Sequence, residues 1–136
     1  MRNLFLAGLV TLIALGGCGR KEFPQADTSE PLRLVGLQHS KEVSILHLSF
    51  TITGGYGAVG YQIDRAELDP VCDCMGEWRR HFEQQVLPRK KSKKLIRNLK
   101  LLSHKREFAF RIRAIDSAGN LSAWSEAMRA RADDIK

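Results

Sequence analysis

The chain has 136 residues, of which 43% are hydrophobic, and it carries 22 Lys and Arg against 15 Asp and Glu, a formal net charge of +7. This length suits one domain with a hydrophobic core of its own, and it is too short for a doubly wound nucleotide-binding sheet with a second, substrate-binding domain.

The first residues have the composition of a secretory leader. Arg2 precedes an apolar segment at 4–15, roughly 12 residues long, which suits the core of a signal peptide and is short for a membrane span of about 20 residues. The segment ends in Leu-Gly-Gly-Cys, at Cys18. These residues resemble the lipobox of bacterial lipoproteins, in which the leader is cut before the cysteine and the thiol carries lipid. The resemblance implies a signal peptide at 1–17 and lipidation of Cys18; a plain secretory signal that happens to contain a cysteine is the alternative.

Residues 18–30 predict a flexible tether, because they are polar, include Pro24 and show no apolar periodicity. Extended, the tether would reach about 40 Å. We expect the chain to be anchored to a membrane by lipid and not to span it. Gly19 stands where many inner-membrane lipoproteins have Asp, so the resemblance favours the outer membrane, facing the periplasm. A location in the cell envelope argues against nucleic acid as a partner.

Between residues 31 and 132 the dominant hydrophobic period is two, which is typical of strands with one buried face. The alternation is clearest at 44–53, 59–65 and 107–116, and weaker alternation predicts strands at 32–37, 77–86, 94–101 and 122–131. About seven short strands in one domain predict an all-β fold, an immunoglobulin-like β-sandwich. Residues 133–136 form a C-terminal tail.

Residues 55–60, GYGAVG, match the G-x-G-x-x-G pattern that binds dinucleotide pyrophosphates. That chemistry needs a helix directly after the glycines, because the phosphate binds to N–H groups at the helix N-terminus. The residues that follow, YQIDR, predict a strand instead. We therefore expect a flexible hairpin loop whose glycines permit positive φ.

The C-terminal sequence EFAFRIRAIDSAGNLSAWSEAMRARA, residues 107–132, resembles the last two strands of a fibronectin type III domain. The resemblance extends over 31–132, although 69–94 match poorly. Phe108 stands where the family usually has a tyrosine, and His104 where proline is common. The family implies a seven-stranded sandwich that acts as a binding module or spacer, without catalytic residues and without a cofactor. The turn DSAGN contains no Arg-Gly-Asp, so integrin-type adhesion is not implied.

Cys72 and Cys74 lie two residues apart in DPVCDCMGEW. With Cys18 carrying lipid, they are an even pair in an oxidising compartment. One interpretation is a disulfide within the C-x-C sequence, and a second is a soft-metal site with His81 or Asp73 as a third ligand. A third interpretation is a redox role or an intermolecular bridge. A fourth is a stapled or reduced loop without further function.

Basic residues are concentrated in RKKSKK, with cations at Arg89, Lys90, Lys91, Lys93 and Lys94. This segment could bind anionic lipid or glycan, each cation near an anionic membrane contributing about 1 kcal/mol, or it could be a solvated loop. We expect no ordered strand through it, because like charges repel and Pro88 interrupts pairing.

Arginines accompany the two tryptophans. Arg111, Arg113 and Arg129 are expected to stack on Trp124 and to brace the sheet, by about 0.5–1 kcal/mol per contact. Trp78 and Arg80 are candidates for contact with a protein partner.

The sequence contains no recognisable catalytic motif, and its four histidines do not have metal-site spacing. We therefore expect no enzymatic activity. The expected function is that of an envelope lipoprotein that binds or scaffolds a protein partner. The alternatives are anionic lipid or glycan binding at 89–94, and a metal or thiol-redox role for Cys72 and Cys74.

Overall fold

The computed structural model describes residues 30–88, 93–102 and 105–132. Cys18, the leader, nearly all of the tether, His104 and the tail lie outside the described residues. Every regular element within them is a strand: β1 (Arg33–Glu42), β2 (Ile45–Thr53), β3 (Val59–Glu67), β4 (Arg79–Leu87), β5 (Leu95–Lys100), β6 (Phe108–Asp116) and β7 (Met128–Ala130). The prediction of an all-β sandwich with about seven strands is confirmed.

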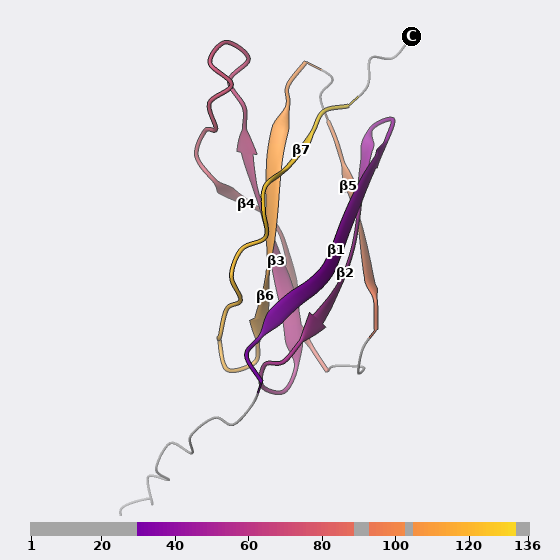
Figure 1. Ribbon diagram of the computed structural model, residues 1–136, viewed down its shortest axis with the longest axis vertical. Helices are drawn as coiled ribbons and strands as arrows, with labels where there is room; N and C mark the ends of the chain where they lie inside the picture. Colours follow the sequence, from indigo (N-terminus) through magenta and orange to yellow (C-terminus); the bar gives the residue numbers. More distant parts are fainter. Residues whose placement is uncertain (1–29, 89–92, 103–104, 133–136) are drawn as a thin grey trace, which may run out of the picture.

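The strands form two antiparallel sheets that face each other (Figure 1). One sheet has the order β1-β2-β5 and the other β4-β3-β6-β7. The alternating apolar residues point between the sheets, where Leu48, Phe50, Ile63 and Ile112 have no exposed surface. The two-residue period of the sequence therefore marks the buried face of each sheet.

The pairing of β3 with β6 is continuous over nine residues, from Val59 opposite Asp116 to Glu67 opposite Phe108. Ile63 lies opposite Ile112 on the core face, and Asp64 opposite Arg111 on the outer face. Phe108, the first residue of β6, is buried and packs against Phe110.

Two strands differ from their predicted lengths. β1 continues to Glu42 instead of ending at residue 37, because a register shift between Val35 and Gln38, where Gly36 has a φ of +63°, absorbs the break in the alternation. The last predicted strand, 122–131, is reduced to Met128–Ala130. Before it, the chain is bonded to β6 partly through serine hydroxyls, which replace the backbone carbonyls of a regular ladder.

The glycine-rich stretch was predicted to be a hairpin loop, and this is wrong: residues 54–58 cross from β2 in one sheet to β3 in the other. Gly54, Gly55 and Gly57 all have positive φ. A side chain at Gly54 would collide with the backbone of Pro31. The glycines thus serve a tight crossover, and a strand, not a helix, follows them.

Asp116 holds this crossover against the turn after β6. Its carboxylate, 1% exposed, accepts hydrogen bonds from the backbone N–H groups of Tyr56, Ala118 and Asn120, and from Asn120 Nδ2, at 2.9–3.0 Å. Burial alone would raise the pKa of Asp116, but the donated hydrogen bonds outweigh burial, so that its pKa lies below the ordinary 3.8.

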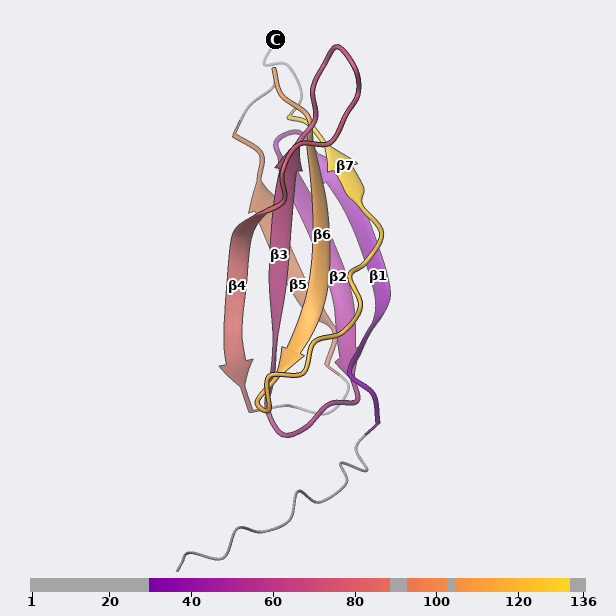
Figure 2. The same ribbon diagram turned by 90° about the vertical axis from the view of Figure 1, so that its left-hand side faces the viewer.

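The sandwich has two distinct ends (Figure 2). At the entry end lie Glu30, where the described chain begins, and the crossover 54–58; Gly55 N donates to Glu30 O at 2.7 Å. At the far end lie the loop 68–78 and the end of the described chain at residue 132. The loop 68–78 thus lies at the end of the sandwich opposite Glu30, where the described chain begins.

We expect Asp116→Asn to lower the free energy of unfolding by about 2 kcal/mol at neutral pH, because an amide nitrogen then faces N–H donors. A carboxylate with a depressed pKa stabilises the fold above its unfolded pKa and loses this effect as pH falls through the folded pKa. The difference between wild type and variant should therefore be complete above pH 3.8 and should shrink below it. Urea unfolding at several pH values measures this, with the exposed Glu126→Gln as control; a difference independent of pH would contradict the assignment.

Candidate functional site

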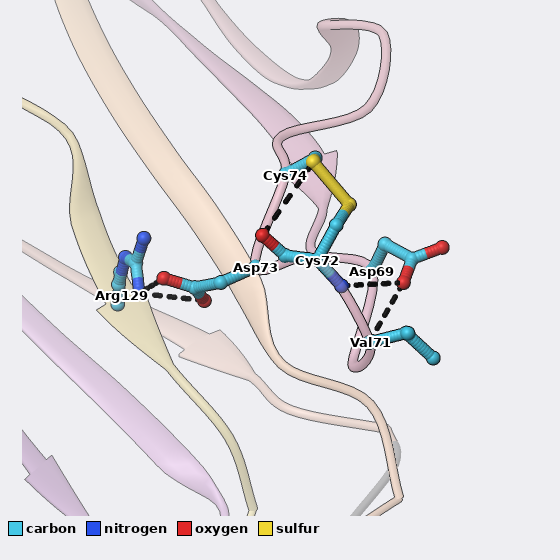
Figure 3. The surroundings of a disulfide bond; sticks show 6 residues. All are labelled: Asp69, Val71, Cys72, Asp73, Cys74 and Arg129. Carbon is cyan, nitrogen blue, oxygen red and sulfur yellow. Dashed lines mark hydrogen bonds and ion pairs between the residues drawn. A yellow bond between two sulfur atoms is a disulfide. The ribbon is translucent and has the colours of Figure 1, made fainter.

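The loop 68–78 at the far end is a compact, disulfide-closed element (Figure 3). Cys72 and Cys74 are bonded to each other. Asp69 Oδ1 accepts hydrogen bonds from the N–H groups of Val71 and Cys72, at 2.8 and 3.3 Å. Gly76 N donates to Glu67 O at the base of the loop. The loop thus has a defined conformation although residues 69–77 are exposed.

The loop is fixed to the edge of the larger sheet by one ion pair. Arg129 on β7 donates from one guanidinium nitrogen to both oxygens of Asp73, at 2.9 Å each. Arg129 was expected to stack on Trp124, but its guanidinium is directed to the loop (Figure 3). The cause is the position of β7, which places Arg129 opposite Ala109, next to the base of the loop.

Two apolar side chains of this loop face solvent. Val71 is 94% exposed and Met75 is 53% exposed. Exposed apolar residues on an ordered loop are characteristic of contact surfaces, and methionine adapts readily to partners of different shape. Val71 and Met75, with the disulfide between them in sequence, make up what we call the tip surface.

The residues considered for a metal site are separated. Asp73 is paired with Arg129, and both thiols are in the disulfide. His81 packs on the ring of Phe110 at 5.7 Å, where burial, with the charges of Arg65 and Arg97, lowers its pKa. Within 30–88, 93–102 and 105–132, no group of three or more His, Cys, Asp or Glu residues could hold a metal ion.

On the outer face of the larger sheet, arginines and tryptophans alternate in a stack. The Arg111 guanidinium lies between two indole rings, 4.3 Å from the centre of Trp78 and 4.2 Å from that of Trp124. The Arg113 guanidinium lies over the Trp124 ring, 4.2 Å from its centre. Ser122 and Ser125, bonded to β6 on either side, hold Trp124 in place. The stack joins β6 to the segments before β4 and after β6.

Carboxylate and amide groups of β3 accept hydrogen bonds from the arginines of the stack. Asp64, 6% exposed, accepts hydrogen bonds from Arg80 Nε at 2.7 Å and from Arg111 at 3.3 Å. The buried Gln62 accepts from Arg113 Nε at 2.9 Å. Trp78 and Arg80, the candidates for partner contact, therefore also brace the sheet. Trp78 is half-buried and Arg80 remains exposed.

The basic segment is only partly described. Arg89, Lys90 and Lys91 lie outside the described residues. Pro88, Lys93 and Lys94 are not in a strand, and the neighbouring strands end at Leu87 and begin at Leu95, at the entry end (Figure 2). The described residues that flank the basic segment thus lie at the same end of the sandwich as Glu30.

The roles of the β3 polar groups and of the tip surface were not evident in the sequence. Asp64 and Gln62 occupy polar positions of an alternating strand, which normally face solvent, and only the register with β6 shows that they meet arginines. Val71 and Met75 follow no periodic pattern. Their position beside two cysteines was the one available signal, since a short disulfide makes an exposed loop rigid.

Comparisons with known proteins do not place the chain in a family: no family model matches it. No curated protein and no solved structure matches either. No helix among the described residues is long and apolar enough to span a membrane.

We expect Asp64→Ala to lower the free energy of unfolding by about 3 kcal/mol, because it leaves Arg111 partly buried without a counter-charge. The control is Glu77→Ala, which breaks the exposed pair with Arg79 and should cost less than about 1 kcal/mol. Chemical denaturation measures both values. Equal effects for the two variants would show that the Asp64 contacts do not stabilise the stack.

Proposed function

We propose that this chain is a lipid-anchored protein of the bacterial cell envelope, whose β-sandwich is a non-enzymatic module that binds a protein partner. The fibronectin type III resemblance supports such a role, and two antiparallel sheets are the architecture it implies. Because sandwiches of this kind serve many functions, the argument depends on the exposed surfaces and not on the fold.

The observation that carries the proposal is the tip surface. It combines exposed apolar side chains with an ordered backbone, so that binding does not require the loop to be ordered first. The tip surface lies at the end opposite residue 30. The expected tether from Cys18 joins the sandwich at residue 30. Anchoring at one end and contact at the other suit a protein that reaches a partner in the periplasm.

A second candidate is contact with anionic lipid or glycan. Lys93 and Lys94 lie at the entry end, together with residue 30. If Cys18 is lipidated, these cations face the anchoring membrane, and each would contribute about 1 kcal/mol to attraction by an anionic surface. Such binding weakens steeply with salt, whereas apolar contact at the tip surface should not.

Site-specific photo-crosslinking in cells tests partner binding. A photoreactive residue at Val71 or Met75 should give one discrete crosslinked protein, and the same probe at Leu121, which is 46% exposed at the entry end, should give none. Cys72→Ser with Cys74→Ser should weaken the crosslink by loosening the loop while the sandwich remains folded. A band from Leu121 alone would place the contact elsewhere, and absence of any protein band would refute the proposal.

Anchoring is tested independently by fractionation. The wild-type chain should be found with membranes and should incorporate a labelled fatty acid, whereas Cys18→Ser should do neither, because a leader of this length without the lipid does not supply a stable span. Lys93→Gln with Lys94→Gln is the matched control and should remain with the membrane. Labelling of the Cys18→Ser chain would show that lipid attachment at Cys18 is not the anchor.

A further inference from the structure

A groove of about 450 Å³ lies between β4 and β5, the neighbouring edge strands of opposite sheets. Its walls are mainly apolar and come from Ile52, Val59, Leu87 and Leu95. The volume is in the range of sites for small molecules. Both strands contribute residues to the walls of the groove. The groove therefore opens into the sandwich between the two edge strands, where the described residues form no further strand.

Arg97 enters this groove from β5. Leu95, Arg97 and Leu99 occupy the inward-facing positions of the strand, and Leu99 is 3% exposed in the core. An arginine at such a position is unusual, because a core-facing residue normally is apolar. Its guanidinium carbon lies 3.6 Å from the centre of the Phe82 ring, which fixes its orientation.

Arg97 combines two features: it has no carboxylate partner, as is also true of the partly buried Arg65 and Arg113, and its Nε is buried without a hydrogen-bond partner among the described residues. Arg80 and Arg111 both pair with Asp64. Burying a cation and an N–H group in this way is costly unless a complementary group is bound.

The other polar groups of the groove suit the same anion. Lys93 lines it at the rim and adds a second positive charge. The phenol of Tyr61 lines it from β3. Tyr61 and Arg97 both lie against Phe82: the Tyr61 and Phe82 ring centres are 5.7 Å apart, and the Arg97 guanidinium is 3.6 Å from the Phe82 ring centre. Burial raises the pKa of Tyr61, while the charge of Arg97 acts in the opposite direction. A neutral phenol can donate a hydrogen bond to an anion held by the guanidinium.

We propose that the groove between β4 and β5 binds a single-chain fatty acid, with the carboxylate at Arg97 and the alkyl chain along the apolar wall. The unpaired cation requires an anion, and the apolar wall requires a hydrophobic body, so a simple inorganic anion would leave most of the groove unfilled. This site is separate from the tip surface, and its existence does not depend on the protein-binding function.

Titration of the full chain carrying Cys18→Ser with dodecanoate, below its micelle-forming concentration, tests the site. Backbone amide shifts report on the groove itself, and those of Gln84 and Ile96 should change and saturate together. Arg97→Gln should raise the Kd at least about tenfold, the loss expected for a charged hydrogen bond, and Arg97→Lys should retain binding. Lys100→Gln, which removes the same charge from the outer face of β5, should change the Kd less than about twofold.

Three results would overturn the proposal. Equal shifts with dodecyltrimethylammonium would mean that the groove accepts any alkyl chain regardless of charge. Equal shifts with acetate would mean that the alkyl chain contributes nothing to binding. An unchanged Kd for Arg97→Gln, in a protein whose spectrum shows the sandwich intact, would mean that the arginine does not hold the head group.

Discussion

The unbroken pairing of β3 with β6 is the constraint on which the rest of the structure depends. One register over nine residues sets both faces of the larger sheet at once. On the inner face it brings Ile63 opposite Ile112, and on the outer face it brings Asp64 opposite Arg111. A slip of one residue would exchange the faces, burying Arg111 in the core and exposing Ile112. Apolar burial and charge pairing favour the same register, so together they specify that register more strongly than either would alone.

The outer face shows how a sheet can remain polar and still be well packed. Arg111 is held between two indole rings and is neutralised by Asp64. The segment after β6 contributes to this arrangement through serine hydroxyls, which keep Trp124 over the arginines. Long side chains thus cover a sheet face over which the described residues place neither a helix nor a second sheet.

The two ends and the open side of the sandwich have different chemistry. The far end carries an exposed apolar tip closed by a disulfide, and the entry end joins the expected tether and the basic segment. Between them, the opening at β4 and β5 contains Arg97, which stacks on Phe82 and has no carboxylate partner among the described residues. We infer that a partner protein at the tip surface and a small amphiphile in the groove would meet separate parts of the molecule, whereas Lys93 belongs both to the basic segment and to the rim of the groove.

The sequence by itself determined the all-β class and the positions of the main strands, because alternation of apolar and polar residues depends only on which face of a strand is buried. It also predicted that Arg111 and Arg113 would stack on Trp124. It did not determine that the glycine-rich stretch crosses between sheets, that Arg129 pairs with Asp73, or that Arg97 points into a groove. These features arise from contacts between residues far apart in the chain. Alternation marks the face of a residue within its own strand, but only the tertiary structure decides which strand, loop or open edge that face meets.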